Sequence, residues 1–196
     1  MELLPKAVFE ASVLASRLKA GSAALLPTDT LPALAAAPDH AAQLWTLKRR
    51  PSDKPLILMG ASSDQLLELT SPLAFEDACL MAKRYWPGAL TLVLPASGMV
   101  AEALNPGAFT LGVRVPDCGV IRNLLERSGP LATTSANLTG FAPTCSAEKA
   151  AACFPGLPVL GPVPWPVPSG LASTVLAWQG AGCWHVLRHG AVLPEL

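Results

Sequence analysis

Segments with helical periodicity alternate along the chain with short apolar runs, and this alternation restricts the possible fold more than any other feature. The apolar residues of 7–20 recur close to a 3.6-residue period, and Gly21 stands where a helix C-terminal cap belongs. The next run, 23–26, is short and apolar and ends at Pro27, which is typical of a buried strand. This order predicts an α/β or α+β fold.

The rest of the chain continues the alternation. Helices are expected over 40–47 with Asp39 as N-cap, from Ser71 and Pro72 to 85, over 120–127, and from the N-cap Ser146 to 153. Strands are expected at 56–59, 90–94, 111–115 and 131–134, and a hairpin from 173–178 and 184–188. The proline-rich segment 155–168 is predicted to be an extended covering loop, with a partner-recognition motif as the alternative.

Length and composition indicate one domain, residues 1–196, that does not cross a membrane. The chain is 51% hydrophobic, yet no run approaches the roughly 18 apolar residues of a membrane span. Residues 1–6 contain an acid and a proline where a signal peptide needs a basic stretch before an apolar core. We therefore expect a cytoplasmic protein.

Charge and cysteine content exclude two classes of site. The formal net charge is zero, which argues against nucleic-acid binding through a large basic field, so any anion site must be local. The five cysteines are odd in number and widely spaced, with no CxxC pair and no histidine at ligand spacing. They are predicted to be reduced and mostly buried, and no metal site is predicted.

Two polar strings point to a polyanionic ligand. Lys48, Arg49, Arg50 and Lys54 place four cations within seven residues, in a chain that otherwise has few charges. Because prolines 51 and 55 disfavour a continuous helix, these cations are predicted to lie on an exposed loop. The string 135–137, Ser-Ala-Asn, supplies donors and acceptors that could share the same ligand.

Polar residues also occur at strand ends and within one strand. Thr28 and Thr30 follow the strand 23–26, where they could meet a ligand or merely cap or turn the chain. Arg114 interrupts an apolar strand, and an unpaired charge there would be costly. It therefore needs a bound ligand or an ion pair, with Asp117 or another acid as the partner.

Seven strings, in order and at compatible spacing, resemble the YrdC-like threonylcarbamoyl-adenylate synthases over nearly the whole chain. They are Pro27-Thr28-Asp29-Thr30, Lys48 and Arg50 with Lys54-Pro55, residues 86–91 (WPGALT), residues 113–116 (VRVP), residues 135–140 (SANLTG), Ser173-Thr174-Val175, and Leu187-Arg188. The chain stops soon after Arg188, so it resembles the single-domain form of the family.

The resemblance implies a fold and a reaction. The fold is a twisted, mixed, largely parallel sheet with flanking helices and an open, positively charged concave cleft. The reaction joins L-threonine, bicarbonate and ATP into threonylcarbamoyl-adenylate and releases pyrophosphate, with Mg²⁺ carried by the nucleotide. The product would serve tRNA modification through a separate threonylcarbamoyl transferase, and weak binding of tRNA by this chain is a further expectation.

Carried over position by position, the resemblance also implies roles for individual residues. The catalytic tetrad would be Lys48, Arg50, Ser135 and Asn137. ATP would be bound by Arg50, Lys54, Thr110, Asn137, Thr144 and Arg188. Threonine would be bound by Thr28, Thr30, Arg114, Ser135 and Ser173, with Arg114 facing the amino-acid carboxylate.

One string departs from the family pattern. After Pro27-Thr28-Asp29-Thr30 the family usually continues with Tyr-Gly-Leu, whereas this chain has Leu31-Pro32-Ala33-Leu34, which alters one wall of the predicted substrate pocket. Two alternatives to the synthase therefore stay open. One is a divergent relative that binds nucleotide or RNA, and the other is an enzyme that transfers carbamoyl groups to another acceptor.

Overall fold

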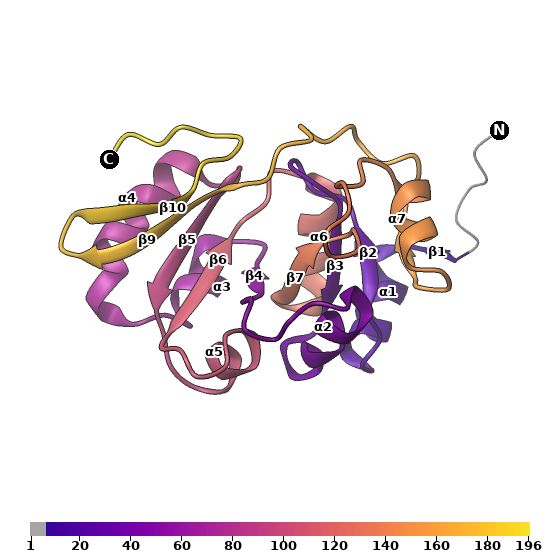
Figure 1. The fold of residues 1–196 in the computed structure, drawn as a ribbon, viewed down its shortest axis with the longest axis horizontal. Coiled ribbons are helices and arrows are strands. Elements are labelled where there is room, and N and C mark those ends of the chain that lie inside the picture. Colours follow the sequence, from indigo (N-terminus) through magenta and orange to yellow (C-terminus); the bar gives the residue numbers. More distant parts are fainter. Residues whose placement is uncertain (1–6) are drawn as a thin grey trace.

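A single mixed sheet organises the computed structural model, which describes residues 7–196 (Figure 1). In sheet order the strands are β1 (Val8–Phe9), β8 (Val159–Leu160), β2 (Ala24–Leu26), β3 (Ala33–Ala36), β7 (Leu131–Ser135), β4 (Ile57–Met59), β6 (Thr110–Arg114), β5 (Leu90–Pro95), β9 (Thr174–Gly180) and β10 (Cys183–Arg188). Pairing is parallel for β1 with β8, β8 with β2, β4 with β6 and β5 with β9, and antiparallel for the other neighbours. The mixed sheet with flanking helices is the architecture that the resemblance implied.

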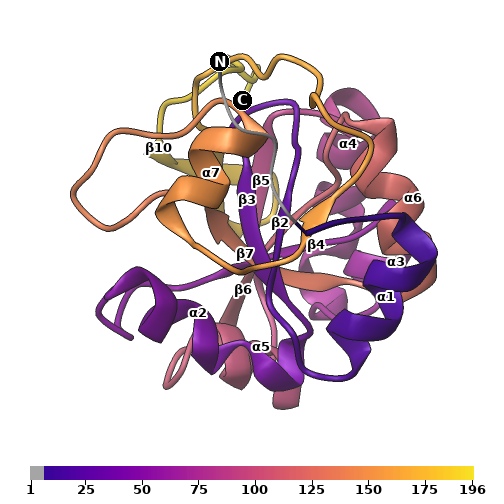
Figure 2. The same ribbon diagram turned by 90° about the vertical axis from the view of Figure 1, so that its right-hand side faces the viewer.

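Helices pack on both faces of strands β2 and β3 (Figure 2). The helices are α1 (Ala11–Lys19), α2 (Ala42–Lys48), α3 (Ser63–Leu67), α4 (Phe75–Tyr85), α5 (Met99–Leu104), α6 (Gly119–Ser128) and α7 (Ala147–Cys153). Helices α1 and α6 bury leucines against alternate residues of β2 and β3, whereas α2 and α7 pack with the residues in between. This period of two follows from the pleat of the strands.

The same alternation separates the two faces of β5 and β6: one packs into the core and the other lines a cleft. Leu92 of β5 and Val113 of β6 pair across the two strands and belong to the core beneath α3, α4 and α5. The neighbouring residues Thr91, Val93 and Arg114 point to the opposite face and line a cleft. The functional side chains therefore stand on strands that the core holds rigidly.

Several elements were predicted correctly, together with their caps. The side chain of Ser71 accepts a hydrogen bond from Leu73 N as a 3-10 turn, Pro72–Ala74, leads into α4. Ser146 caps α7 by accepting from Lys149 N. Gly21 follows α1 with φ of 96°, a conformation that favours glycine. Strands β2, β4, β5, β6 and β7, helix α6 and the final hairpin also lie where they were expected.

Other boundaries were wrong or missed. The first helix begins at Ala11, because residues 8 and 9 instead pair with β8 at the sheet edge. Asp39 is not an N-cap, since it lies inside the 3-10 helix Pro38–His40 and α2 is preceded by Ala41. Strands β1, β3 and β8 and helices α3 and α5 were not predicted.

The proline-rich segment packs on the fold, as expected for a covering loop. Trp165 is buried and its indole Nε1 donates to Leu160 O at 2.7 Å. Beyond it, Ser169 N donates to Asp29 O and Gly170 N to Thr30 O, so the chain crosses the loop that follows β2 (Figure 1). Two residues of the segment, Val159–Leu160, form β8 rather than loop.

Three further expectations concern location and cysteines. Within residues 7–196, each helix is too short or too polar to span a bilayer. The stretch 1–6, used above to argue against a signal peptide, lies outside the described residues. All five cysteines are free, but Cys145 and Cys183 are exposed and only Cys118 is fully buried, so the expectation of mostly buried cysteines was wrong.

Candidate active site

A cleft of about 360 Å³ opens on the exposed face of the central strands. Its lining includes the cations Arg50, Lys54, Arg114 and Arg188, the hydroxyl residues Thr30, Thr91, Ser135 and Ser173, and the apolar residues Leu56, Ile57, Met59, Val93, Val175 and Leu187. Among the described residues, none of the side chains that line it is acidic. Burial lowers the pKa of both Arg50 and Arg114, and the charge of Arg188 lowers each further. Like charges gathered without an acid in the lining favour an anionic ligand.

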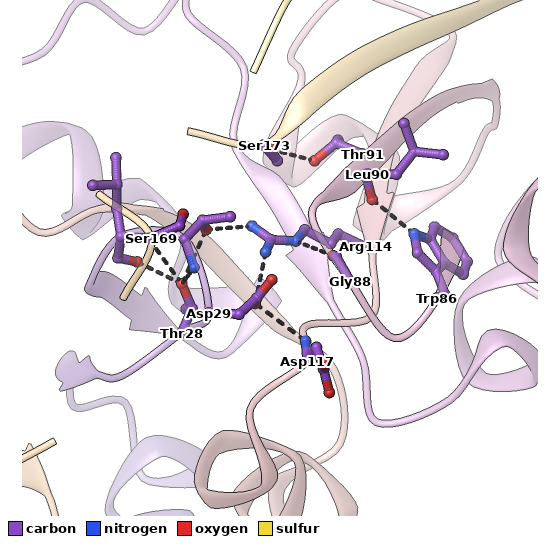
Figure 3. A network of polar contacts seen from close by, with 12 residues as sticks. Thr28, Asp29, Trp86, Gly88, Leu90, Thr91, Arg114, Asp117, Ser169 and Ser173 are labelled. Atoms are coloured by element: carbon purple, nitrogen blue, oxygen red, sulfur yellow. Dashed lines mark hydrogen bonds and ion pairs between the residues drawn. The ribbon is translucent and has the colours of Figure 1, made fainter. Parts of the chain in front are cut away.

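Arg114 is held by three hydrogen bonds at one end of the cleft (Figure 3). Its Nε donates to Gly88 O at 2.8 Å, one terminal nitrogen donates to Thr30 Oγ1 at 2.7 Å, and the other donates to Asp29 Oδ1 at 2.7 Å. Burial lowers the pKa of this guanidinium, an effect that the charge of Asp29 opposes. The ion-pair partner left open by the sequence is therefore Asp29, while Asp117 contributes its backbone N–H to the same carboxylate oxygen at 3.1 Å.

Thr28 and Thr30 have different functions in the loop after β2. Thr28 Oγ1 donates to Leu31 O at 2.7 Å and accepts from the backbone N–H groups of residues 30 and 31. It is buried and lies outside the cleft lining, so it turns the chain, which was one of the two interpretations open from the sequence. Thr30 lines the cleft beside Arg114.

Ser173 and Arg188 are joined on the opposite wall. Arg188 donates through Nε and one terminal nitrogen to Ser173 O, at 3.0 and 2.9 Å, and reaches Ser173 Oγ at 3.1 Å. Ser173 Oγ also lies 2.8 Å from Thr91 Oγ1 (Figure 3). Because these bonds fix the guanidinium at one edge, its charge is presented to the cleft in a defined position.

Lys48 does not lie on an exposed loop, and that prediction was wrong. Helix α2 continues through Lys48, whose residue is only 2% exposed, and the chain turns at Arg49 with φ of 49°. The ammonium donates to Ser135 O, to Asn137 O at 2.6 Å and towards Ser135 Oγ at 3.3 Å. Lys48 is therefore outside the cleft lining and holds the backbone of 135–137 in place.

This environment gives a testable dependence of stability on pH. Burial, with the positive charge of Arg50, lowers the pKa of Lys48 from 10.5 to about 8. Between these values the unfolded chain binds more protons than the folded one, so the free energy of unfolding should rise with pH from about 8 towards 10.5. Urea unfolding at pH 7.5 and 9.5 should show this rise in the wild type and not in Lys48→Met. Parallel pH profiles would contradict the prediction.

Arg50 and Lys54 are the members of the cationic string that reach the cleft. One terminal nitrogen of Arg50 donates to Pro55 O at 3.1 Å, while its Nε is buried and has no hydrogen-bond partner in the structure. Burial lowers the pKa of Arg50, and Asp53 opposes the shift. Lys54 lines the cleft and is exposed, as predicted, whereas Arg49 is exposed and outside the lining.

Two further predicted nucleotide contacts, Asn137 and Thr144, are outside the cleft lining. Asn137 donates through Nδ2 to Leu138 O and Phe141 O, and its Oδ1 is buried without a partner in the structure. Buried Thr144 donates to Ala136 O at 2.9 Å. Neither residue lines the cleft, so both shape the 135–137 loop in the structure described.

Thr110 is also outside the cleft lining, whereas its hydrogen-bond partner Asn105 is part of it. The side-chain amide of Asn105 donates to Thr110 Oγ1 at 3.0 Å and to Thr110 O at 3.2 Å. Asn105, which sequence reasoning did not single out, lines the cleft instead. Asp29, Thr91 and Gly112 were also missed as site residues, although Asp29 stands within the quoted string 27–30 and Thr91 within 86–91.

Metal ligands are a separate question. Over residues 7–196, three or more His, Cys, Asp or Glu side chains do not gather anywhere in an arrangement that could hold a metal ion. A carboxylate is likewise not among the side chains of the cleft.

Comparisons with known proteins converge on one group. A protein-family model for Sua5, YciO and YrdC, described as telomere recombination, matches residues 16–190. The threonylcarbamoyl-AMP synthase of Bacillus subtilis is 38% identical over 172 residues, which is 83% of this chain and 48% of that protein. The threonylcarbamoyl-AMP synthase of Pyrococcus abyssi is 38% identical over 148 residues, which is 74% of this chain and 43% of that protein.

A solved structure shows the same fold. The crystal structure of Pyrococcus abyssi Sua5 complexed with L-threonine superposes with a TM-score of 0.85 and 31% identity, covering 96% of this chain and 57% of that chain. This chain spans about half the length of the two curated relatives: 43% of the Pyrococcus abyssi protein and 48% of the Bacillus subtilis protein. Family and fold can be compared over that part, which contains the cleft.

Proposed function

The chain belongs to the Sua5, YciO and YrdC family, and from this membership we propose that it is a threonylcarbamoyl-AMP synthase, a nucleotidyltransferase acting on L-threonine, bicarbonate and ATP. Relatives that carry this name and a related structure complexed with L-threonine support the proposal. The observation that carries it is the cleft, in which Arg50, Lys54, Arg114 and Arg188 gather without an acidic neighbour in the lining.

The proposed reaction suits this surface. The amine of threonine adds to the carbon of bicarbonate, and loss of water gives a carbamate. A carbamate oxygen then attacks the α-phosphorus of ATP, the bond to the β-phosphate oxygen breaks, and pyrophosphate leaves with its electron pair. The reacting carboxylate, carbamate and phosphate groups are anionic, so fixed cations and alignment supply the catalysis, and a protein nucleophile is not required.

The amino acid is assigned to the end of the cleft at Arg114. Three N–H groups of Arg114 are engaged by Gly88, Thr30 and Asp29, and the remaining ones can bind the carboxylate of threonine. Ser135 and Ser173 line the cleft and could bind the hydroxyl or the carbamate. Thr28 would act indirectly, by holding Thr30 in place.

The nucleotide is assigned to the end at Arg50 and Lys54. Arg50 can bind two phosphate oxygens with its planar fork, and Lys54 can follow the phosphates as a flexible point charge. Arg188 would neutralise the developing charge between the two ends. Lys48 is proposed as a positioning residue for Ser135. A supporting role next to the nucleotide is proposed for Thr110, Asn137 and Thr144.

Several accompanying proposals follow from the same assignment. Mg²⁺ would enter bound to the phosphates of ATP, because the cleft lining offers it no carboxylate. Residues 1–196 would act as one YrdC-like domain in the cytoplasm. The adenylate product would pass to a tRNA threonylcarbamoyl transferase, and weak tRNA binding by this chain is a secondary proposal that the zero net charge does not favour.

The test is pyrophosphate release by the purified protein. It should be measured with ATP and bicarbonate, with and without L-threonine, and the nucleotide product should be identified by mass. Threonine-dependent formation of threonylcarbamoyl-adenylate is the expected result, and it would show that Leu31-Pro32-Ala33 is a tolerated variation.

Two other outcomes would favour the alternatives. Turnover of ATP with bicarbonate and a different amine would identify a carbamoyl-transferring relative with another acceptor. Binding of tRNA that weakens steeply with salt, without ATP turnover, would identify an RNA-binding relative. Either result would overturn the synthase assignment.

A further inference from the structure

Gly112 stands in the middle of the cleft floor without a side chain. It is the third residue of β6, where it pairs with Ile57 of β4 on one side and Val93 of β5 on the other. All three residues line the cleft. The registers of β6 with β4 and β5 run through Gly112 without a shift, so a bulge does not account for the glycine.

Neither the backbone nor the packing requires glycine at this position. Gly112 does not have the positive φ that would favour it. A Cβ built on it would lie 3.6 Å from Ile57 Cγ1, 3.8 Å from Thr91 Cγ2 and 3.9 Å from Val93 Cγ2, which are ordinary van der Waals contacts. Glycine inside a strand weakens it and often marks a place where a ligand approaches the backbone closely.

The surroundings indicate which part of a ligand approaches. The three heavy atoms nearest to a Cβ at Gly112 are all carbons, Ile57 Cγ1, Thr91 Cγ2 and Val93 Cγ2, so the floor there is apolar. Carboxylate, carbamate and phosphate groups gain nothing from an aliphatic floor. Of the proposed reactants, only the nucleoside half of ATP has a flat and largely apolar surface, which such a floor can hold by van der Waals contact.

We propose that Gly112 is a specificity-determining residue that admits the nucleoside of ATP to the floor between Ile57 and Val93. The proposal rests on the proposed function for the identity of the nucleotide. Along β6, Gly112 lies two residues from Arg114 and two from Thr110, and alternate residues of a strand share a face. A nucleoside seated there would keep its phosphates within the same cleft as the cations.

The experiment compares Gly112→Ala and Gly112→Val with the wild type and with Gly119→Ala. Gly119 begins α6, also lacks a positive φ, and a Cβ there meets nothing within 4 Å, so it is a matched glycine outside the cleft. Calorimetry would measure the dissociation constants of Mg-ATP and of tripolyphosphate, which carries the charges without a nucleoside. Thermal unfolding would monitor the fold.

We expect Gly112→Val to weaken binding of Mg-ATP by about tenfold or more, with a smaller effect for Gly112→Ala, because added methyl groups overfill the floor. Tripolyphosphate binding should stay within about twofold, and both variants should unfold at or above the wild-type temperature, because a side chain favours the strand. Gly119→Ala should bind both ligands like the wild type.

Opposite results would overturn the inference. Unchanged Mg-ATP binding by folded Gly112→Ala and Gly112→Val would do so, as would equal weakening of Mg-ATP and tripolyphosphate. A different result would contradict the proposed function without affecting this inference. If the wild type makes no threonylcarbamoyl-adenylate but the contrast between Mg-ATP and tripolyphosphate persists, the nucleoside seat stands and the reaction does not.

Discussion

Asp29→Ala is expected to lower the free energy of unfolding by about 3–5 kcal/mol, since breaking a buried ion pair leaves the other charge uncompensated. The side chain of Arg114 is 3% exposed and that of Asp29 18%, with 2.7 Å between the paired atoms. Asp29 also accepts from Asp117 N, so the same substitution removes the link between the loop after β2 and the start of α6. Urea unfolding at pH 7 would measure the loss.

Two variants separate the charge from other effects. Asp117→Ala keeps its backbone N–H and removes an exposed carboxylate, so a change within about 0.5 kcal/mol is expected. Adding Arg114→Met to Asp29→Ala should recover part of the loss, because the orphaned charge is removed as well. If Asp29→Ala unfolds like the wild type, or if Asp117→Ala is the more damaging change, the assignment of the ion pair is wrong.

The fold was predictable where local signals and burial agree. Strands β5 and β6 are largely aliphatic, and the 3-10 turn before α4 and helix α7 have serine caps that the structure confirms. Strand β3 was missed because Ala33–Ala36 lacks both β-branched residues and alternation, and only pairing with β2 and β7 makes it a strand. The two-residue strands β1 and β8 are strands because they pair with each other and β8 also pairs with β2, which no local pattern encodes.

The sequence motifs that contain the site residues could be predicted, but which of their side chains line the cleft could not. The sequence brings Lys48 and Arg50 within three residues, yet the end of α2 at Lys48 directs one ammonium under the 135–137 loop, and the left-handed turn at Arg49 returns Arg50 to the cleft. Asp29 was missed as a site residue because its ion-pair partner Arg114 is distant in the sequence.

Arg50→Ala is expected to reduce synthesis of threonylcarbamoyl-adenylate by about 10²–10³-fold, comparable to the loss of one preorganised donor to developing charge. Its guanidinium lines the cleft, where a terminal nitrogen can bind a phosphate oxygen. Folding should change little, because within residues 7–196 the Arg50 side chain makes a single hydrogen bond, to Pro55 O. Steady-state assays with saturating threonine would measure the loss.

Lys54→Ala and Arg49→Ala complete the comparison. Lys54 lines the cleft but is exposed and flexible, so its loss should be smaller than that of Arg50 and should appear mainly in the KM for ATP. Arg49 has the same charge and a neighbouring position, yet it is outside the cleft lining, so Arg49→Ala should retain activity. A well-folded Arg50→Ala with normal activity would remove the phosphate role from this string, because the charge would then be shown to act no differently from that of Arg49.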